Sequence, residues 1–221
     1  MKPKTMTRLD WLSVNMVDPY HPDTSWESLA EYHANMIYDL FGWQLDLDVK
    51  PGRAHQHTSL AGSGAILFFG GTSGMTFELP GIPCAVLHAA GKMRQTVETA
   101  LAQGSVTRLD IATDIETDTD PRDFVLARVG ARLKSHQTVV SPSGVTCYLG
   151  SPKSDRFARV YRYHEPHERA GLLRVEMVFR KQQAHHAARE WLRLGDDEFA
   201  AQAGNIYGWT HEDWDPKARR F

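Results

Sequence analysis

Alternating apolar and polar positions predict strands along much of the chain. Arg8–Met16 and Val106–Asp114 alternate well enough for strands, and so do Arg156–Tyr163 and Leu172–Arg180 on either side of a polar turn. Three shorter runs are also predicted to be strands: Trp43–Val49, Ala65–Phe69 and Met75–Leu79. The glycine pair between the last two favours a hairpin.

Apolar residues at helical spacing predict helices between the strands. A capping-box pattern at Thr24–Glu27 precedes one helix, which Gly42 ends. Further helices are expected over Ala85–Gln103, weakened by Gly91, from Asp120 to about Arg132, and from Gln182 to about Ala203 with a break at Gly195. Helices among hairpin-compatible strands predict an α+β fold, with a largely antiparallel sheet and helices packed on one face.

Composition indicates a folded globular protein. Apolar residues make up 42% of the 221 residues, and no apolar stretch approaches the roughly 20 residues of a membrane span. We therefore expect one cytoplasmic domain over 1–221, whose tail at 206–221 is ordered only where Trp209 and Trp214 dock. The two cysteines form no metal-binding pair, and the eleven histidines carry no metal-binding motif and are interpreted as surface residues.

A net charge of −2 argues against a general nucleic-acid binder. Basic residues nevertheless gather within one segment, so a local basic patch remains open. The members of this group are Lys153, Arg156, Arg159, Arg162, Arg169, Arg174, Arg180 and Lys181.

One face of the predicted strand Arg156–Tyr163 carries Arg159, Tyr161 and Tyr163. A tyrosine flanked by arginines, with carboxylates on neighbouring strands, is what a metal-assisted phosphoryl transfer to a tyrosine hydroxyl requires. Because the unperturbed tyrosine pKa is about 10, we expect nearby cations such as Arg159 to favour the phenolate.

Three acidic residues are candidate ligands for Mg²⁺ or Mn²⁺. Asp110, Asp114 and Glu176 converge if their two strands are close in one sheet, and hard cations take oxygen ligands. The alternative is a set of structural ion pairs, in which Arg108 and Arg174 neutralise the same acids.

Six short motifs in order resemble the replication initiation factor family (the Rep_trans type) of rolling-circle plasmids, filamentous phages and some conjugative elements. Together they cover most of the chain. They are L-D-W-L-S-V at Leu9–Val14, F-E-L-P-G-I-P-C at Phe77–Cys84, T-R-L-D-I-A-T-D at Thr107–Asp114, Y-L-G-S-P-K-S at Tyr148–Ser154, R-V-Y at Arg159–Tyr161 and L-R-V-E at Leu173–Glu176.

The resemblance implies an enzyme that nicks and joins DNA with a tyrosine and a divalent metal, on a fold related to HUH endonucleases. It aligns Tyr161 with the nucleophile, and Asp110 and Glu176 with the motif acids; Asp114 and Glu78 are further candidate ligands. This chain has Tyr163 where the family often has a basic residue, so either tyrosine remains a candidate for attack. Pro152 replaces the arginine of the family's G-S-R-K-S motif.

The leading hypothesis is a rolling-circle replication initiator, and the alternative is a catalytically inactive DNA-binding regulator or inhibitor on the same scaffold. The expected partner is single-stranded or hairpin origin DNA, with a host helicase, a polymerase and a second copy of the chain as further candidates. The expected DNA contacts are Lys153, Ser154, Arg156, Arg108 and Arg174.

Overall fold

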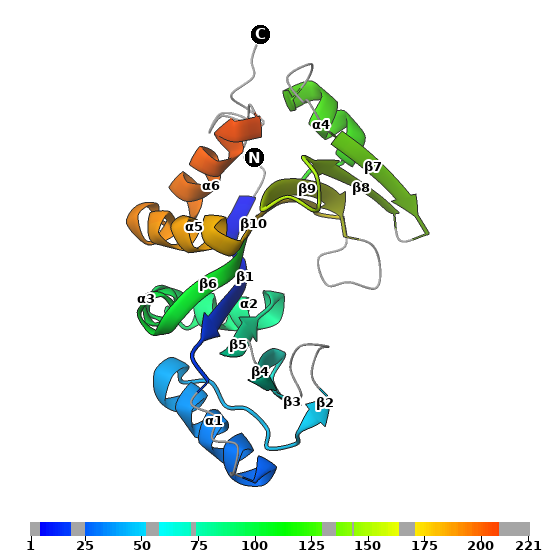
Figure 1. Ribbon diagram of the computed structural model, residues 1–221. Helices are drawn as coiled ribbons and strands as arrows, with labels where there is room; N and C mark the ends of the chain where they lie inside the picture. The colour runs from blue at the N-terminus through cyan, green and yellow to red at the C-terminus, as the bar shows by residue number, and fades with distance from the viewer. Residues whose placement is uncertain are drawn as a thin grey trace. The chain divides into compact units, whose positions relative to one another are not determined.

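The computed structural model describes residues 5–18, 25–51, 58–71, 74–129, 136–142, 144–163 and 171–207. Figure 1 shows its helices and strands in chain order. The first half holds β1 (Thr5–Met16), α1 (Trp26–Phe41), β2 (Lys50–Pro51), β3 (Thr58–Gly62), β4 (Ala65–Gly71), β5 (Gly74–Leu79), α2 (Gly81–Ala89) and α3 (Met93–Gln103). The second half holds β6 (Gly104–Ile115), α4 (Pro121–Val129), β7 (His136–Ser141), β8 (Gly144–Leu149), β9 (Arg156–Arg162), β10 (Leu173–Arg180), α5 (Lys181–Leu194), α6 (Asp196–Gly204) and the 3-10 turn η2 (Asn205–Tyr207).

The chain forms two compact units. Unit 1 comprises Met1–Leu9, Asp110–Gln183 and Arg193–Phe221, and unit 2 comprises Asp10–Leu109 and Ala184–Leu192. Strands β1 and β6 contribute residues to both units. The expectation of a single domain over 1–221 stays a prediction.

The described strands of unit 1 are hydrogen-bonded in the order β1-β6-β10-β9-β8-β7, and every pairing from β10 to β7 is antiparallel. Helix α4 packs on β8 and β9 (Figure 1). The apolar face of β9 is fully buried at Ala158 and Val160, and the Phe179 ring of β10 lies 5.6 Å from the Phe199 ring of α6. The other face of β9 carries the polar side chains of Arg159 and Tyr161 together with the buried ring of Phe157.

The strands of unit 2 follow the order β2-β3-β4-β5-β1-β6, with antiparallel pairing from β2 to β1. Phe41 at the end of α1 packs on Phe77 of β5, with ring centroids 5.0 Å apart. The predicted α+β fold with a largely antiparallel sheet and packed helices is confirmed, and so is the predicted hairpin at β4 and β5.

Two predicted elements of unit 2 are wrong. Trp43–Val49 is irregular, because single hydrogen bonds tie it to β3 instead of a ladder: Trp43 Nε1 donates to the Gly62 carbonyl and Asp46 N to the Ala61 carbonyl, both at 3.0 Å. The expected helix over Ala85–Gln103 is two helices, α2 and α3, because Gly91 takes a left-handed φ of 67° between them.

The helix ends are close to their predicted positions elsewhere. The N-cap of α1 is Ser25, whose hydroxyl accepts the Ser28 amide, so the cap lies one residue after the predicted Thr24, and Gly42 is the C-cap. The break between α5 and α6 falls at Gly195 as expected, with φ of 79°. Strand β3 was not predicted. Trp209, Trp214 and the His55–His57 pair lie outside the described residues.

His33 of α1 corrects the interpretation of the histidines as surface residues. Its ring is completely buried, stacks on Phe69 and lies between two oxygens: Nδ1 is 2.7 Å from the Leu29 carbonyl and Nε2 is 2.9 Å from Asp18 Oδ1. Asp18 Oδ2 also accepts the Gly70 amide at 2.9 Å. This residue is therefore part of the framework of unit 2.

Candidate active site in unit 1

The candidate site lies where β9 and β10 pair. The alternation of β9 puts Arg159 and Tyr161 on one face, as predicted. The register of the two strands sets Arg159 opposite Glu176 and Tyr161 opposite Arg174. Since directly opposed residues share a face, four polar side chains meet on the same side of the sheet.

Glu176 is the centre of this group. Arg159 donates two hydrogen bonds to it, from Nε to Oε2 at 2.7 Å and from a terminal nitrogen to Oε1 at 2.6 Å. The Tyr161 hydroxyl donates a third, to Oε2 at 3.1 Å. Glu176 is 1% exposed, whereas the Arg159 side chain is 31% exposed. The carboxylate is thus enclosed, and its basic partner reaches the surface.

Asp110 of β6 is the second acid at this place. It is completely buried and hydrogen-bonded to Glu176. The two acids therefore lie close together on neighbouring strands, and the hydrogen bond with Asp110 is one of the causes that lower the pKa of Glu176.

Asp114 of β6 has a different partner. Arg174 donates to both of its oxygens, at 2.7 and 2.8 Å, and both side chains are almost fully buried. The Arg174 guanidinium also lies 4.9 Å from the centre of the Tyr163 ring, which meets the Tyr161 ring edge-on at 5.6 Å. For these two residues the structure contains the ion pair that the sequence left open as an alternative to a metal site.

The electrostatic surroundings act on the two central groups in opposite directions. Burial raises the pKa of Tyr161, and the negative charge of Glu176 raises it further, against the smaller effects of Arg174 and Arg159. Burial alone would raise the pKa of Glu176, but the hydrogen bonds and charge of Arg159 and the bond from Asp110 lower it overall. Arg159 does favour the phenolate, as expected, but burial and the charge of Glu176 outweigh it, so the pKa of Tyr161 is raised overall.

The residues expected to contact DNA lie in different surroundings. Lys153 and Arg156 are exposed, and the Ser154 hydroxyl is held in the turn between them by the carbonyl oxygens of Ser151 and Arg156. Arg174 is only 2% exposed. Arg108 belongs to unit 2, where its guanidinium lies 3.8 Å over the Trp11 ring.

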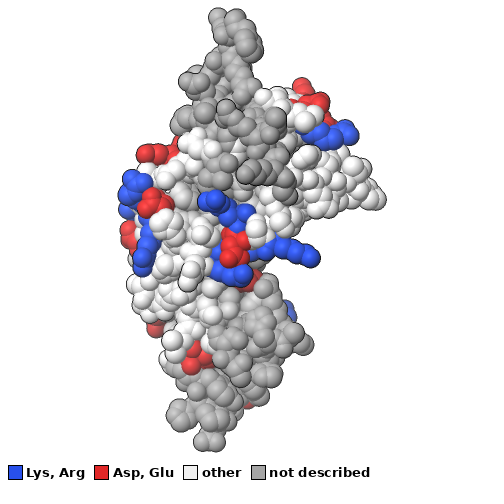
Figure 2. Space-filling model, turned by 45° about the horizontal axis from the view of Figure 1, so that its top comes forward, with Lys and Arg blue, Asp and Glu red and all other residues white. Residues whose placement is uncertain are grey.

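Several members of the basic segment are engaged within unit 1. Arg162 donates to the carbonyls of Thr117 and Thr119, Arg180 to that of Pro152, and Lys181 pairs with Asp155. Figure 2 shows blue and red side chains gathered side by side on the visible face. The segment therefore does not act as one continuous positive patch, and Lys153 and Arg156 are its surface cations without an ion pair among the described residues.

Of the three acids predicted to bind a divalent ion, only Asp110 and Glu176 have surroundings that suit one. The described part of the chain contains no group of three or more histidine, cysteine or acidic side chains placed to hold a metal. Asp110 and Glu176 do fit by chemistry: they are adjacent carboxyls, and a hard cation takes carboxylate oxygens as ligands. Asp114 is bound on both oxygens by Arg174, and Glu78 is a buried residue of unit 2 opposite Ser13.

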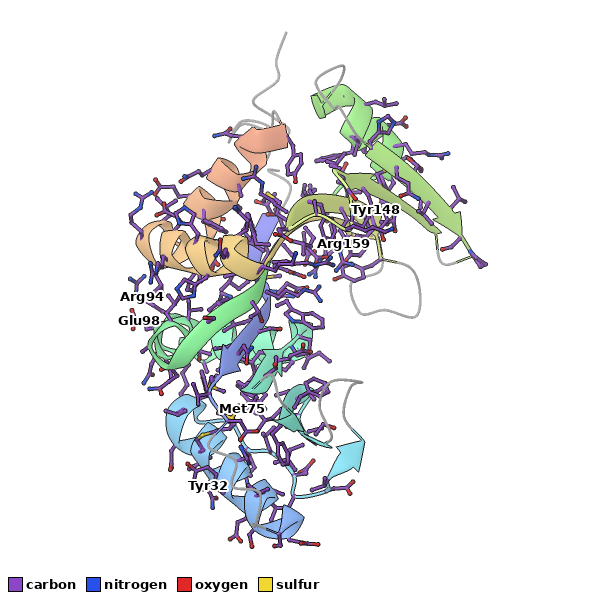
Figure 3. The ribbon with its side chains drawn as sticks, viewed as in Figure 1. Tyr32, Met75, Arg94, Glu98, Tyr148 and Arg159 are labelled. Atoms are coloured by element: carbon purple, nitrogen blue, oxygen red, sulfur yellow. The ribbon has the colours of Figure 1, made fainter. Side chains whose placement is uncertain are left out.

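Tyr148 of β8 is a neighbour of the site that the sequence reasoning did not single out. The register places it directly opposite Arg159, and Figure 3 labels both side chains on their adjacent strands. The alternation of Thr146–Leu149 indicated which residues share its face, but only strand pairing could reveal which residue of β9 it faces.

Comparison with known proteins identifies the fold. No family model and no curated protein matches the sequence. Among solved structures, the chain has the fold of a rolling circle replication initiator, which is the fold that the six motifs implied. The matching structure is the rolling circle replication initiator protein from Geobacillus stearothermophilus, with a TM-score of 0.67, 18% identity, and coverage of 93% of this chain and 86% of that chain.

The described helices include none with the length and hydrophobicity needed to cross a membrane.

Proposed function

We propose that this protein is a rolling-circle replication initiator that nicks and rejoins a DNA strand through Tyr161. The observation that carries the proposal is the hydrogen bond from the Tyr161 hydroxyl to Glu176, which is itself paired with Asp110, on a fold shared with a replication initiator. A largely buried phenol beside two buried carboxyls supplies both a nucleophile and an acceptor for its proton.

The chemistry at Tyr161 is a phosphoryl transfer. The phenol proton passes to Glu176 as the Tyr161 oxygen forms a bond to phosphorus, and the bond from phosphorus to the 3′ oxygen of the preceding nucleotide breaks. That oxygen takes a proton from water, which leaves a 5′ phosphotyrosine and a free 3′ hydroxyl. Because the phosphodiester bond is exchanged and not hydrolysed, the reverse reaction rejoins the strand.

Asp110 and Glu176 would hold the Mg²⁺ or Mn²⁺ ion in this proposal. When bound, such an ion polarises the scissile phosphate and stabilises negative charge on its oxygens. Arg159 occupies both Glu176 oxygens, so it must give up at least one of them when the ion binds. Its exposed side allows the released guanidinium to turn toward a DNA phosphate.

A DNA-binding regulator without catalysis is the second candidate. The observation that favours it is the same pairing: Glu176 is fully engaged by Arg159, and the pKa of Tyr161 is raised, which disfavours the phenolate. In this alternative, the protein would bind DNA through the sheet face that carries Tyr161 and would leave the strand uncut.

A covalent-adduct assay separates the two. Purified protein is incubated with Mg²⁺ or Mn²⁺ and 5′- and 3′-labelled single-stranded DNA from a hairpin origin, and the products are separated on a denaturing gel. The proposal expects a cleaved strand whose 5′ end migrates with the protein. The adduct should be absent for Tyr161→Phe, which keeps the ring, and present for Tyr163→Phe. An adduct lost only in Tyr163→Phe would reassign the nucleophile, and intact DNA with the unaltered protein under all these conditions would favour the regulator.

A further inference from the structure

The aromatic ring of Tyr148 lies in one row with the candidate active site. Cross-strand pairing joins Gln137 of β7, Tyr148 of β8, Arg159 of β9 and Glu176 of β10, so these four residues occupy the same face of unit 1. The neighbouring row contains Thr146 and Tyr161. Tyr148 therefore lies one strand away from the arginine that binds Glu176 (Figure 3).

The two faces of these strands differ in burial. Cys147 and Leu149 of β8 and Val160 of β9 share one face, and all three are buried. Tyr148 and Thr146 alternate with them and are partly exposed, and Gln137, in the same row as Tyr148, is exposed. The face that carries Tyr161 is therefore also accessible to solvent at Thr146, Tyr148 and Gln137.

The contacts of Tyr148 leave its ring available at the surface. Its centroid lies 6.3 Å from that of Phe157, whose side chain is buried and supports it from one side. Among the described residues its hydroxyl has no hydrogen-bond partner, although buried tyrosines normally find one. A partly exposed ring that is supported by a neighbouring ring, on a strand face that also carries an arginine, is the arrangement on which unpaired nucleobases stack.

We propose that Tyr148 is a base-stacking residue for single-stranded DNA, next to the strand segment presented to Tyr161. This inference rests on the proposed function for the identity of the ligand and adds a specific contact to it. Stacking tolerates every base, since each has an aromatic face, and it requires a base that is not already stacked in a duplex. Tyr148 therefore contributes affinity for single strands without reading their sequence.

The test measures DNA binding apart from cleavage. Fluorescence anisotropy with a labelled oligodeoxythymidylate of about 16 nucleotides, in EDTA, is carried out on the Tyr161→Phe protein and on versions that also carry a Tyr148 substitution. Tyr148→Ala should weaken binding between about fivefold and about 150-fold, the range expected for one stacked base. Tyr148→Phe should bind as tightly as the parent protein, because it retains the ring.

Matched controls distinguish stacking from a structural effect. Tyr38→Ala removes an equally aromatic surface residue, 57% exposed on α1 of unit 2, and should leave affinity unchanged. Tyr148→Leu keeps an apolar side chain in place and should lose affinity like Tyr148→Ala. A strand of the same length with abasic sites should bind the parent and Tyr148→Ala proteins equally, which loss of folding would not produce.

The inference is overturned if Tyr148→Ala and the parent bind oligodeoxythymidylate equally, or if the abasic strand shows the same loss. Failure of the proposed function has a separate signature: single strands bind in a Tyr148-dependent way, but protein with an intact Tyr161 forms no adduct with metal present.

Discussion

Arg159 and Glu176 are joined by two hydrogen bonds, at 2.7 and 2.6 Å, so the guanidinium occupies both oxygens of the carboxylate that accepts the Tyr161 hydroxyl. A cation bound at Glu176 must compete with this pairing. The affinity of the site for metal is therefore set partly by the arginine that lies beside it.

Replacing Arg159 tests this competition. Arg159→Gln leaves a buried carboxylate without its main partner, and we expect the metal-free protein to lose about 3 kcal/mol of stability, the lower end for a broken buried pair because Arg159 is partly exposed. Mn²⁺ should then bind more tightly than to the unaltered protein, measured by calorimetry, and should raise the melting temperature more. Equal or weaker Mn²⁺ binding would place the ion away from Glu176.

The two acids have their own test. Asp110→Ala and Glu176→Ala should each abolish metal-dependent cleavage while leaving most of the affinity for DNA, because these carboxyls do not attract phosphate. Cleavage is followed on a denaturing gel and affinity by anisotropy with the same strand. A variant that cleaves at the unaltered rate would show that its residue is not a ligand.

The Arg174–Asp114 pair predicts a stability effect. Both side chains are almost fully buried, so Asp114→Asn should destabilise unit 1 by about 3–5 kcal/mol by leaving the guanidinium incompletely paired. The double variant Asp114→Leu, Arg174→Met should recover part of that loss, since neither charge remains. Urea unfolding of the three proteins checks this. Calorimetry with Mn²⁺ on folded Asp114→Asn also tests Asp114 as a ligand: unchanged affinity would leave it a purely structural role.

Lys153 and Arg156 should act on affinity through charge. If each contacts one phosphate of a single strand, neutralising both should reduce the slope of log affinity against log salt by about 1.4. The matched control is Lys92→Ala with Arg94→Ala, which removes two positive charges from exposed residues of unit 2 (Arg94 is labelled in Figure 3). An unchanged slope for the first pair, or an equal change for the control, would contradict a specific contact.

His185 should make stability depend on pH. Its Nδ1 accepts the Val106 amide at 3.3 Å, and burial, with the charge of Arg189, lowers its pKa. A lowered pKa in the folded state means that the contribution is present above the unfolded value of about 6.5 and is lost as the pH falls through the folded value. The difference in urea midpoint between the unaltered protein and His185→Ala should therefore shrink from pH of about 8 to about 5. His186→Ala, at the exposed neighbour, should show no such change.

The sequence by itself determined the strands and faces that carry the chemistry. Alternation is a local property of the backbone, so it placed Arg159 with Tyr161 and Asp110 with Asp114 before any contact was known. Glycines likewise marked the end of α1 and the break at Gly195, because a left-handed residue ends a helix wherever it occurs. The same local reasoning failed at Trp43–Val49, where alternating burial of Trp43 and Leu45 arises from packing without a strand.

Only the tertiary structure decided which arginine binds which acid. The sequence left the acids of β6 and β10 as either a metal cluster or ion pairs, because the partners are about 17 to 60 residues apart and their meeting depends on strand order and register. Pairing of β9 with β10 directed Arg159 to Glu176, and the place of β6 beside β10 directed Arg174 to Asp114. The rise in the pKa of Tyr161 follows from that choice, since it depends on burial and on where each neighbouring charge is already engaged.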